Sequence, residues 1–411
     1  MMFENKTTMK YSKIKFLTFF AIICSIGLAP INDASAAENT VIATVPVGTN
    51  PEGIAFDSAN NRMYVANQDD DTVSVINTTT NAVDATISVG TNPDGIAFDS
   101  ANNRMYVANA VANTVSVINT ATNAVDATIS VGTTPSGIAF DSANNRMYVP
   151  NYSDDTVSVI NTTTNAVDAT ISVGDGPRAI AFDSANNRMY VPNYSDDTVS
   201  VINTTTNAVD ATISVGDGPR AIAFDSANNR MYVTNSLTTT VSVINTTTNA
   251  VDATISLTSS PQGIAFDSAN NRMYVANLVG DTVSVIDTSD NTVTATITVG
   301  DGPLGVAFDS ANNRMYVTNY SAGTVSVIDI APTSSSSDCY DCIPPKLQQI
   351  QINTPTDNYV LTGDDQLHIT ANVGDTISVN LQITDNISVQ SIPSAALYTN
   401  YQEKPSDMSA F

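Results

Sequence analysis

The sequence is poor in the residues from which most catalytic and metal sites are built. Its 411 residues include one histidine, three cysteines and no tryptophan, and 15 Lys and Arg stand against 40 Asp and Glu. One histidine excludes a histidine-rich metal centre. A formal net charge of −25 argues against a surface that binds nucleic acid. We therefore predict no nucleic-acid partner, no cofactor and no catalytic residues.

The composition favours a folded chain of strands and loops. Hydrophobic residues make up 42% of the sequence and charged residues only 13%, which suffices for a core and is atypical of a disordered chain. Of the 40 acidic residues only four are Glu. Asp is common in turns and Glu in helices, so this imbalance indicates a β-rich fold.

The N-terminal segment predicts export. Four lysines between positions 6 and 15 precede an apolar run over 16–29, and Ala34-Ser35-Ala36 offers small residues for cleavage. We interpret residues 1–36 as a signal peptide, which makes the protein secreted or cell-surface, with no membrane span after removal. The alternative is an uncleaved anchor, for which the 14 apolar residues are short.

Most of the chain consists of copies of one unit. The string A-F-D-S-A-N-N-R-M-Y-V occurs seven times, and its phenylalanines are 42 residues apart: Phe56, Phe98, Phe140, Phe182, Phe224, Phe266 and Phe308. β-branched residues alternate or form short runs, and Asn, Asp, Ser and Thr clusters separate these runs as turns. The unit that begins at residue 135 predicts four strands, at Gly137–Phe140, Arg146–Asn151, Thr156–Asn161 and Val167–Val173.

Four strands in each of seven repeats predict an all-β, seven-bladed β-propeller over residues 37–330. The first and third strands carry apolar residues on both faces, as expected for blades covered by their neighbours. The last repeat ends after its third strand, whereas Asn39–Gly48 matches the fourth-strand segment Asn81–Gly90. We expect this N-terminal strand to close the ring by completing the last blade. An open β-solenoid, the alternative, would not need its last strand to come from the N-terminus.

The repeat resembles that of the YVTN-family β-propellers. Tyr232–Asn235 and Tyr316–Asn319 spell Y-V-T-N, and the other five copies read Y-V-A-N or Y-V-P-N. The resemblance implies a seven-bladed propeller, often found on archaeal surface-layer-type and bacterial exported proteins, and no single activity. Related propellers include a lactonase group and the propeller domain of nitrous oxide reductase, whose copper-site histidines are absent here.

The C-terminal part differs in composition. Residues 331–345 form a Ser-rich linker with Cys339 and Cys342 at C-x-x-C spacing. In an exported chain we interpret these cysteines as a local disulfide, with free thiols or an intermolecular pair as alternatives. Residues 346–411 return to a β pattern and resemble immunoglobulin-like or PKD-like surface modules, although 66 residues are too few for a complete sandwich, which needs about 100.

Each repeat carries an Asp five residues before an Arg, as in Asp57 and Arg62. We interpret the pair as structural, with the Asp accepting turn N–H groups and the Arg pairing with it. Acidic clusters are potential Ca²⁺ ligands but lack a calcium-loop spacing, so solvated turns are the better interpretation. These clusters contribute Asp70, Asp71, Asp154, Asp155, Asp196 and Asp197.

Asn-x-Ser/Thr sequences occur in several copies of the repeat and once in the tail. In an exported protein of a glycosylating host they would be acceptors on exposed turns. They begin at Asn77, Asn151, Asn161, Asn193, Asn203, Asn245, Asn319 and Asn386.

Differences between the copies gather in two loops, which occupy 49–53 and 67–72 in the first copy. Antiparallel connectivity places both loops on one rim of the ring, here called the variable rim. The D-S-A-N-N-R and N-T-T-T-N turns, which hardly vary, lie on the opposite, invariant rim. We interpret the variable rim as a recognition face; the alternative, drift, should have touched both rims.

On the variable rim we expect a binding site at the mouth of the central channel. Arg178 and Arg220 are the arginines outside the Asp/Arg pairs, and Tyr152, Tyr194 and Tyr320 lie on the outer loops. Arg and Tyr are enriched at binding hot spots. An acidic or glycan ligand could bridge the two arginines.

These features predict an exported, non-enzymatic propeller that acts as a cell-surface recognition or envelope scaffold protein, with an unknown protein or glycan partner. The alternative is an enzyme or cofactor-binding propeller, either a lactonase-like hydrolase or a quinone-dependent oxidoreductase. Lactonase-like propellers hold a divalent metal in the channel with acidic and Asn ligands, whereas the inner strands here offer carboxylates only near the rims.

Overall fold

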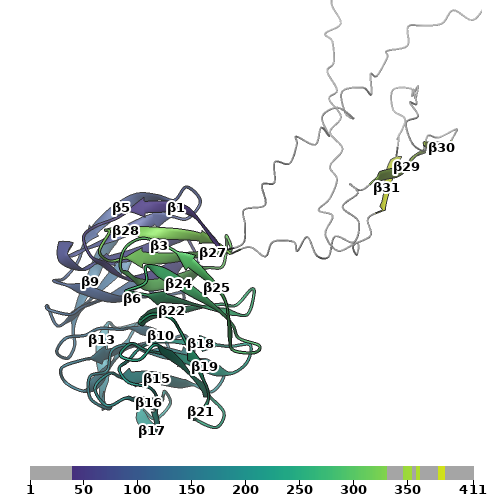
Figure 1. Cartoon of the computed structure of the whole chain (residues 1–411). Coiled ribbons are helices and arrows are strands. Elements are labelled where there is room, and N and C mark those ends of the chain that lie inside the picture. The colour runs from purple at the N-terminus through teal and green to yellow at the C-terminus, as the bar shows by residue number, and fades with distance from the viewer. Residues whose placement is uncertain (1–38, 331–345, 354–357, 362–377, 385–411) are drawn as a thin grey trace, which may run out of the picture. The chain divides into compact units, whose positions relative to one another are not determined.

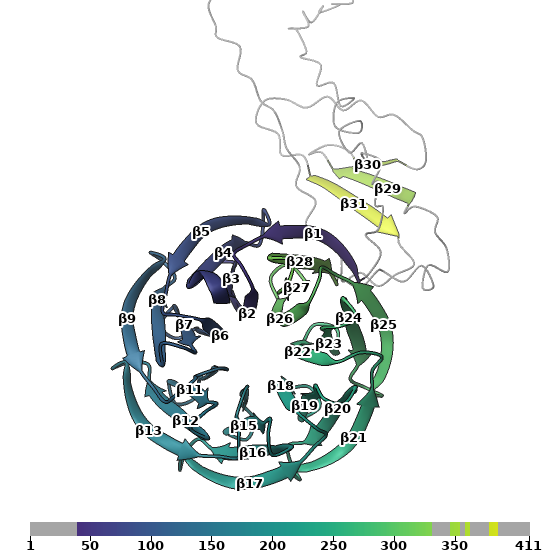
Figure 2. The ribbon, with the colours of Figure 1, turned by 60° about the vertical axis from the view of Figure 1, so that its left-hand side comes forward.

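Each repeat folds into a four-stranded antiparallel sheet, and seven such sheets surround a common axis (Figures 1 and 2). The structure is a computed structural model that describes residues 39–330, 346–353, 358–361 and 378–384. The seven-bladed β-propeller predicted from the 42-residue period is confirmed. A single turn of 3-10 helix, Gln68–Asp70, interrupts the strands, and no helix among the described residues is long and apolar enough to cross a membrane.

The strands of successive blades have nearly the same bounds within the repeat. The innermost strands are β2 (Pro51–Asp57), β6 (Pro93–Asp99), β10 (Ala139–Asp141), β14 (Ala181–Asp183), β18 (Pro219–Asp225), β22 (Pro261–Asp267) and β26 (Pro303–Asp309). The second strands are β3 (Arg62–Asn67), β7 (Arg104–Asn109), β11 (Arg146–Asn151), β15 (Arg188–Asn193), β19 (Arg230–Asn235), β23 (Arg272–Asn277) and β27 (Arg314–Asn319).

The outer half of each blade is equally regular. The third strands are β4 (Thr72–Asn77), β8 (Thr114–Asn119), β12 (Thr156–Asn161), β16 (Thr198–Asn203), β20 (Thr240–Asn245), β24 (Thr282–Asp287) and β28 (Thr324–Asp329). The outermost strands are β5 (Ala82–Ser88), β9 (Ala124–Ser130), β13 (Ala166–Ser172), β17 (Ala208–Ser214), β21 (Ala250–Ser256), β25 (Thr292–Thr298) and, for the last blade, β1 (Thr40–Pro46).

Two innermost strands, β10 and β14, are shorter than the sequence pattern predicts. Both lie in blades whose second strand reads Y-V-P-N, with Pro150 and Pro192 next to the strand end. Proline has no N–H to donate to a neighbouring strand. Pairing in these two blades is therefore reduced at the rim to the isolated bridges Pro135–Asn151 and Pro177–Asn193.

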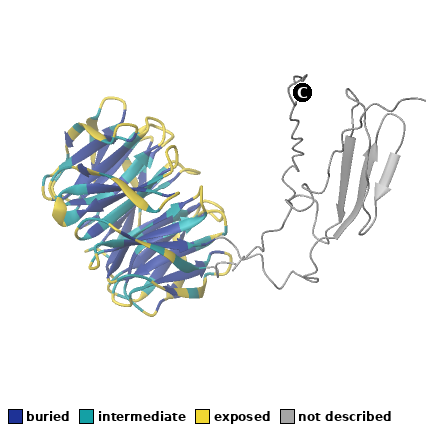
Figure 3. Ribbon diagram, turned by 90° about the horizontal axis from the view of Figure 1, so that it is seen from above, coloured by how far each residue is buried: buried dark blue, intermediate teal, exposed yellow. Residues whose placement is uncertain are grey.

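The core lies between blades. Second and third strands are buried on both faces, whereas the innermost strands are half-buried, which corrects the prediction for the first strand (Figure 3). Tyr64, Val73 and Val75 of one blade pack against Met105 and Val107 of the next. Because every blade repeats this arrangement, no blade covers its own apolar faces, and each depends on both neighbours.

The ring is closed by the N-terminal strand, as predicted. β1 pairs antiparallel with β28, from Thr40 opposite Asp329 to Pro46 opposite Thr324. Val45 is 3% exposed and joins the apolar cluster between the last blade and the first. β1 thus completes the four-stranded sheet of the last blade, and β28 is paired on both sides.

The invariant rim holds the blades together through hydrogen bonds. The hydroxyl of Tyr64 donates to Oδ1 of Asn123 in the next blade at 2.9 Å, and every blade repeats this bond. At the closure the acceptor is Asn39, which receives the Tyr274 hydroxyl at 2.8 Å. Burial raises the pKa of Tyr64 to about 12 and the charge of Asp57 adds to the effect, so the hydroxyl stays a donor at neutral pH.

The Asp of each Asp/Arg pair caps its turn, as predicted. Oδ1 of Asp57, a fully buried side chain, accepts the N–H groups of Ala59 and Asn60 at 2.9 and 3.1 Å. The predicted partner of Arg62 is wrong, however. Arg62 forms its ion pair with Asp84 of the outermost strand at 3.7 Å, because strand register carries the long side chain outward across the blade.

The C-terminal unit contains a separate small sheet. β29 (Lys346–Asn353) pairs antiparallel with β30 (Asn358–Leu361) on one edge and with β31 (Ser378–Thr384) on the other. The chain divides into two compact units, of which Ala34–Thr333 holds the propeller. The immunoglobulin-like or PKD-like character of the tail stays a prediction. The signal peptide and the Cys339–Cys342 pair lie outside the described residues.

Deletion of β1 tests ring closure. Without Thr40–Pro46 the last blade exposes β28 and the apolar cluster that includes Val45, so we expect aggregation or a large fall in melting temperature. Differential scanning calorimetry and size-exclusion chromatography measure both effects. A deletion variant that melts like the parent would show that β1 does not hold the ring closed.

The turn geometry predicts unequal roles for the two members of an Asp/Arg pair. Asp183 is fully buried and accepts three hydrogen bonds, two from the Ala185 and Asn186 N–H groups. Asp183→Ala should lower the free energy of unfolding by about 2–4 kcal/mol. Arg188→Ala loses only a 4.0 Å, partly exposed ion pair with Asp210, so we expect less than about 1 kcal/mol. Equal shifts of the two variants in urea unfolding would contradict this assignment.

Candidate functional site

One position of the repeat is occupied by a different kind of side chain in almost every blade. It follows the conserved proline of the innermost segment and lines a cavity of about 140 Å³ on the ring axis. The seven residues, in blade order, are Glu52, Asp94, Ser136, Arg178, Arg220, Gln262 and Leu304. The otherwise repetitive ring therefore carries acids on one side of its axis and bases on the other.

The small size of this cavity follows from glycine at the next position. A Cβ atom on Gly53 would overlap the carbonyl oxygen of Asp94, and one on Gly305 would overlap that of Glu52. Glycine thus lets the innermost segments of neighbouring blades approach closely in five of the seven blades, whereas alanine follows Arg178 and Arg220. The close approach brings side chains from all seven blades into one cavity.

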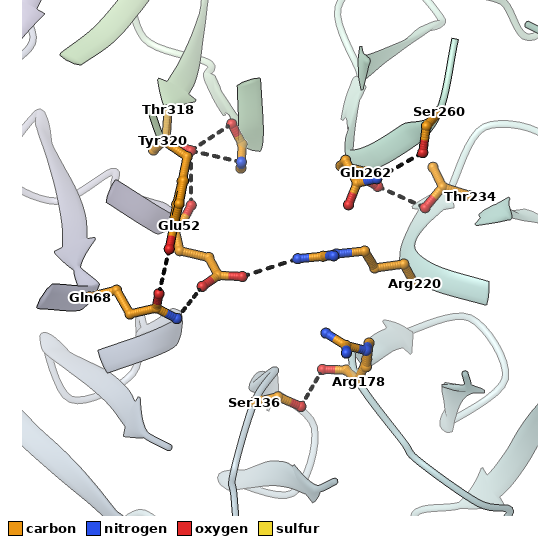
Figure 4. Close-up of polar contacts among 11 residues, drawn as sticks. Glu52, Gln68, Ser136, Arg178, Arg220, Thr234, Ser260, Gln262, Thr318 and Tyr320 are labelled. Atoms are coloured by element: carbon orange, nitrogen blue, oxygen red, sulfur yellow. Dashed lines mark hydrogen bonds and ion pairs between the residues drawn. The ribbon is translucent and has the colours of Figure 1, made fainter. Parts of the chain in front are cut away.

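An ion pair crosses the mouth of the channel. Arg220 Nη2 lies 3.2 Å from Glu52 Oε1, and joins the fifth blade to the first (Figure 4). Gln68 donates from Nε2 to Glu52 Oε2 at 2.7 Å, and its Oε1 accepts the hydroxyl of Tyr320 at 2.9 Å. Glu52 is therefore held from both sides and neutralises Arg220.

Arg178 is positioned differently. Its guanidinium carbon lies 4.8 Å from the ring centre of Tyr152 and 4.6 Å from that of Tyr194, so cation–π contacts hold it between two aromatic rings. Within the part of the chain that the structure describes, its side chain donates no hydrogen bond, and its Nε is buried without a partner. Arg178 is thus a fixed cation whose hydrogen-bonding capacity is unused.

Two further groups in the cavity lack partners among the described residues. Gln262 is 3% exposed; its Nε2 donates to Ser260 Oγ at 3.1 Å, but its Oε1 accepts nothing. The Asp94 carboxyl also has no hydrogen bond. Burial, and next the negative charge of Glu52, raise the pKa of Asp94 to about 8, while Arg220 and Arg178 act in the opposite direction.

The structure brings together most of the predicted binding residues but changes their roles. Arg178, Tyr152 and Tyr194 form one stack, whereas Tyr320 supports the Glu52 side of the mouth. Arg220 is paired, so the expectation that one ligand bridges two free arginines is wrong. Sequence reasoning missed Glu52, Asp94 and Gln262, although aligning the repeats at Arg178 identifies the same position in every blade.

The acidic clusters hold neighbouring loops together by accepting hydrogen bonds from backbone N–H groups. Asp70 Oδ2 accepts the Thr49 N–H at 2.6 Å, and Asp71 Oδ1 accepts the Asn92 N–H at 2.8 Å. The other two clusters bond in the same way, through Asp154, Asp155, Asp196 and Asp197. Among the described residues no three His, Cys, Asp or Glu side chains gather to hold a metal ion. The interpretation as turns therefore accounts for these residues without calcium.

Burial separates the potential glycosylation acceptors into two groups. Asn151, Asn193 and Asn319 are 0% exposed, and each donates from Nδ2 to a Thr and a Ser hydroxyl, which removes them as acceptors in the folded protein. The remaining sequons of the ring begin at the half-exposed ends of third strands, at Asn77, Asn161, Asn203 and Asn245. Asn386 lies outside the described residues.

A larger cavity, of about 490 Å³, lies at the periphery between the second and third blades. Its polar lining includes Asp154, Thr156 and Ser158, and the Asp154 carboxylate is already bonded to the Thr133 backbone N–H. The axial cavity instead collects unpartnered ionisable groups. We therefore place the candidate site at the axial cavity on the variable rim.

A protein family described as "Lactonase, 7-bladed beta-propeller" matches residues 77–336. The chain belongs to this lactonase family of seven-bladed β-propellers. No curated protein matches the chain. Among solved structures, Kuenenia stuttgartiensis hydrazine synthase is similar, with 20% sequence identity, a TM-score of 0.64 and coverage of 69% of this chain and 97% of that chain. At this identity the likeness shows the fold alone, and the resemblance to YVTN-family propellers stays a prediction.

Family membership raises the question of a metal in the channel. The carboxylates of Glu52 and Asp94 are the acidic groups that line the axial cavity, and Glu52 is already paired with Arg220. Two cations, Arg178 and Arg220, line the same cavity. This set of described residues does not fit a divalent metal ion, because it supplies two positive charges where oxygen donors are needed.

The pKa of Asp94 predicts how stability depends on pH. The folded protein binds a proton at Asp94 that the unfolded chain releases above about pH 4, so this group makes the fold less stable as pH rises toward 8. Asp94→Asn should match the parent in melting temperature near pH 4 and exceed it by a few degrees at pH 8.5. Melting curves of the two proteins across this range measure the effect. A constant difference at all pH values would contradict it.

Proposed function

We propose that this propeller is an exported, non-enzymatic recognition protein that binds small carboxylates at the mouth of its channel on the variable rim. The observation that carries the proposal is the Arg178 guanidinium. It is fixed between two tyrosine rings, lines a cavity and has an unpartnered, buried Nε. Guanidinium groups bind carboxylates through paired, charge-assisted hydrogen bonds.

The cost of burying such a group supports the proposal. A buried N–H without a partner costs roughly 1–3 kcal/mol, so an arginine in this state destabilises the free protein. A buried donor without a partner in a native structure calls for an explanation, and a ligand that completes its hydrogen bonds would supply one. The residue types also agree with a binding surface, since Arg and Tyr dominate hot spots.

Export and a cell-surface role come from the predicted signal peptide over residues 1–36. A propeller suits this setting, because each blade has only two short edge strands, one at the axis and one at the periphery. In this proposal the ring is a stable support, and the rim carries the specificity.

Lactone hydrolysis is the second candidate. It is favoured by the family to which the chain belongs and by Asp94, a carboxyl with a raised pKa that shares the cavity with Arg178. In such a reaction Asp94 would take a proton from water, the water oxygen would bond to the lactone carbonyl carbon, and Arg178 would stabilise the oxyanion. The ring C–O bond would then break, and the leaving alkoxide would take the proton from Asp94, which gives the hydroxy acid and restores the carboxylate.

Titration of the full chain with sodium propionate tests carboxylate binding. We expect saturable binding by calorimetry, and Arg178→Ala should weaken it at least tenfold, because it removes the guanidinium that receives the carboxylate. Arg188→Ala is the matched control, since it removes the same charge at the start of β15 and should leave binding unchanged. Loss of binding in both variants, or in neither, would contradict the site.

A pH-stat assay with γ-butyrolactone separates the two candidates. The non-enzymatic proposal expects no acid release above the rate in buffer. Acid release that Asp94→Asn abolishes and Arg188→Ala preserves would establish the hydrolase instead.

A further inference from the structure

The unpartnered groups of the axial cavity differ in chemical character, and this difference restricts what can bind. Arg178 offers hydrogen-bond donors and a positive charge. Gln262 Oε1 offers an acceptor, and Asp94 offers a carboxyl group with no hydrogen bond among the described residues. A ligand that satisfies all three must accept hydrogen bonds at one end and donate them at the other.

We propose that the small carboxylate bound at this mouth is a zwitterion of the α-amino acid type with a short side chain. Its carboxylate accepts hydrogen bonds from Arg178, and its ammonium group donates to Gln262 Oε1 and to Asp94. The inference rests on the proposed function, which it deepens by naming the ligand class.

The volume of the cavity sets the size of the ligand. About 140 Å³ corresponds to a sphere roughly 6 Å across, or to the space of four or five water molecules at about 30 Å³ each. A compact molecule of five or six non-hydrogen atoms fits this space. An α-amino acid of that size also keeps its two charges close together.

The Glu52–Arg220 pair leaves the Arg178 guanidinium and the Asp94 carboxyl for the ligand. Glu52 and Arg220 neutralise each other at 3.2 Å, and Gln68 completes the coordination of Glu52. The remaining ionisable groups are Arg178 and Asp94. A plain carboxylate pairs with Arg178 alone and leaves Gln262 Oε1 buried without a donor, which an ammonium group would satisfy.

The net charge of the protein also favours a zwitterionic ligand. At −25 the chain repels anions at long range, whereas a zwitterion carries no net charge and approaches without this penalty. Inside the cavity the two charges of the ligand then meet their complements at short range. Electrostatics therefore favours a zwitterion over an anion of the same shape.

Proton release or uptake at Asp94 on binding provides a second way to identify the ligand class. The charged groups that act on Asp94 are Glu52, Arg220 and Arg178. A ligand ammonium beside Asp94 favours its ionised form, so binding lowers the pKa of Asp94 and releases a proton at neutral pH. A plain carboxylate brings a negative charge only, which favours the protonated form and leads to proton uptake.

Three ligands of nearly identical shape test the proposal: L-alanine, L-lactate and propionate, which differ in carrying an ammonium, a hydroxyl or a hydrogen at the α-carbon. Calorimetry on the full chain should give an affinity for L-alanine at least tenfold above that for propionate. Repeating the titrations in buffers of different ionisation enthalpy should show proton release with L-alanine and uptake with propionate.

Asp94→Asn should reduce the preference for L-alanine over propionate to less than threefold and abolish proton release. Asp217→Asn is the matched control, because Asp217 is exposed in the loop between β17 and β18 and does not line the cavity. It makes the same carboxyl-to-amide change on the same rim and should leave the preference unchanged. Circular dichroism verifies that both variants fold.

The outcomes separate this inference from the function on which it rests. Equal affinities for L-alanine and propionate, both lost in Arg178→Ala, would overturn the zwitterion and leave the carboxylate site intact. Tightest binding of L-lactate would likewise overturn the ammonium requirement. Absence of binding by all three ligands would overturn both proposals.

Discussion

The mutual covering of neighbouring blades is the constraint on which the rest of the structure depends. A sheet whose second and third strands are apolar on both faces cannot stand alone in water, and a row of such sheets is stable only when the last covers the first. β1 supplies that closure by completing the last blade. The Tyr–Asn hydrogen bonds then fix the angle between blades at every interface, including the bond from Tyr274 to Asn39.

This constraint explains which parts of the repeat vary. The invariant rim carries the turn of Asp57 and the bond of Tyr64 to the next blade, so a change there disturbs an interface. The variable rim is held by bonds of its own, such as that from the Asn92 N–H to Asp71, and its variation alone is no sign of function. The case for a site rests on chemistry instead: on the same rim, Arg178 and Gln262 carry buried polar atoms without partners.

The fold could be predicted from the sequence because a 42-residue period and an offset fourth strand specify a closed ring, and bounds such as Arg146–Asn151 follow from alternation and turn residues. The partners of individual side chains could not be predicted from the sequence. Arg62 reaches Asp84 rather than Asp57, since register across three strands decides which groups meet. The pairing of Arg220 with Glu52 likewise depends on how closely distant blades approach the axis, a distance that no local pattern encodes.

A ring of near-identical blades is symmetric about its axis, and a symmetric mouth cannot orient a small asymmetric ligand. Here one residue per blade breaks the symmetry, while glycine at the next position in five of the seven blades keeps those residues close together. Because the position lies beside the axis, changes in separate blades meet in one cavity. Pairing Glu52 with Arg220 removes one charge of each sign, and the stack of Tyr152 and Tyr194 fixes Arg178. The repeated blades thus form the ring, and different residues at one repeated position are enough to make its mouth asymmetric.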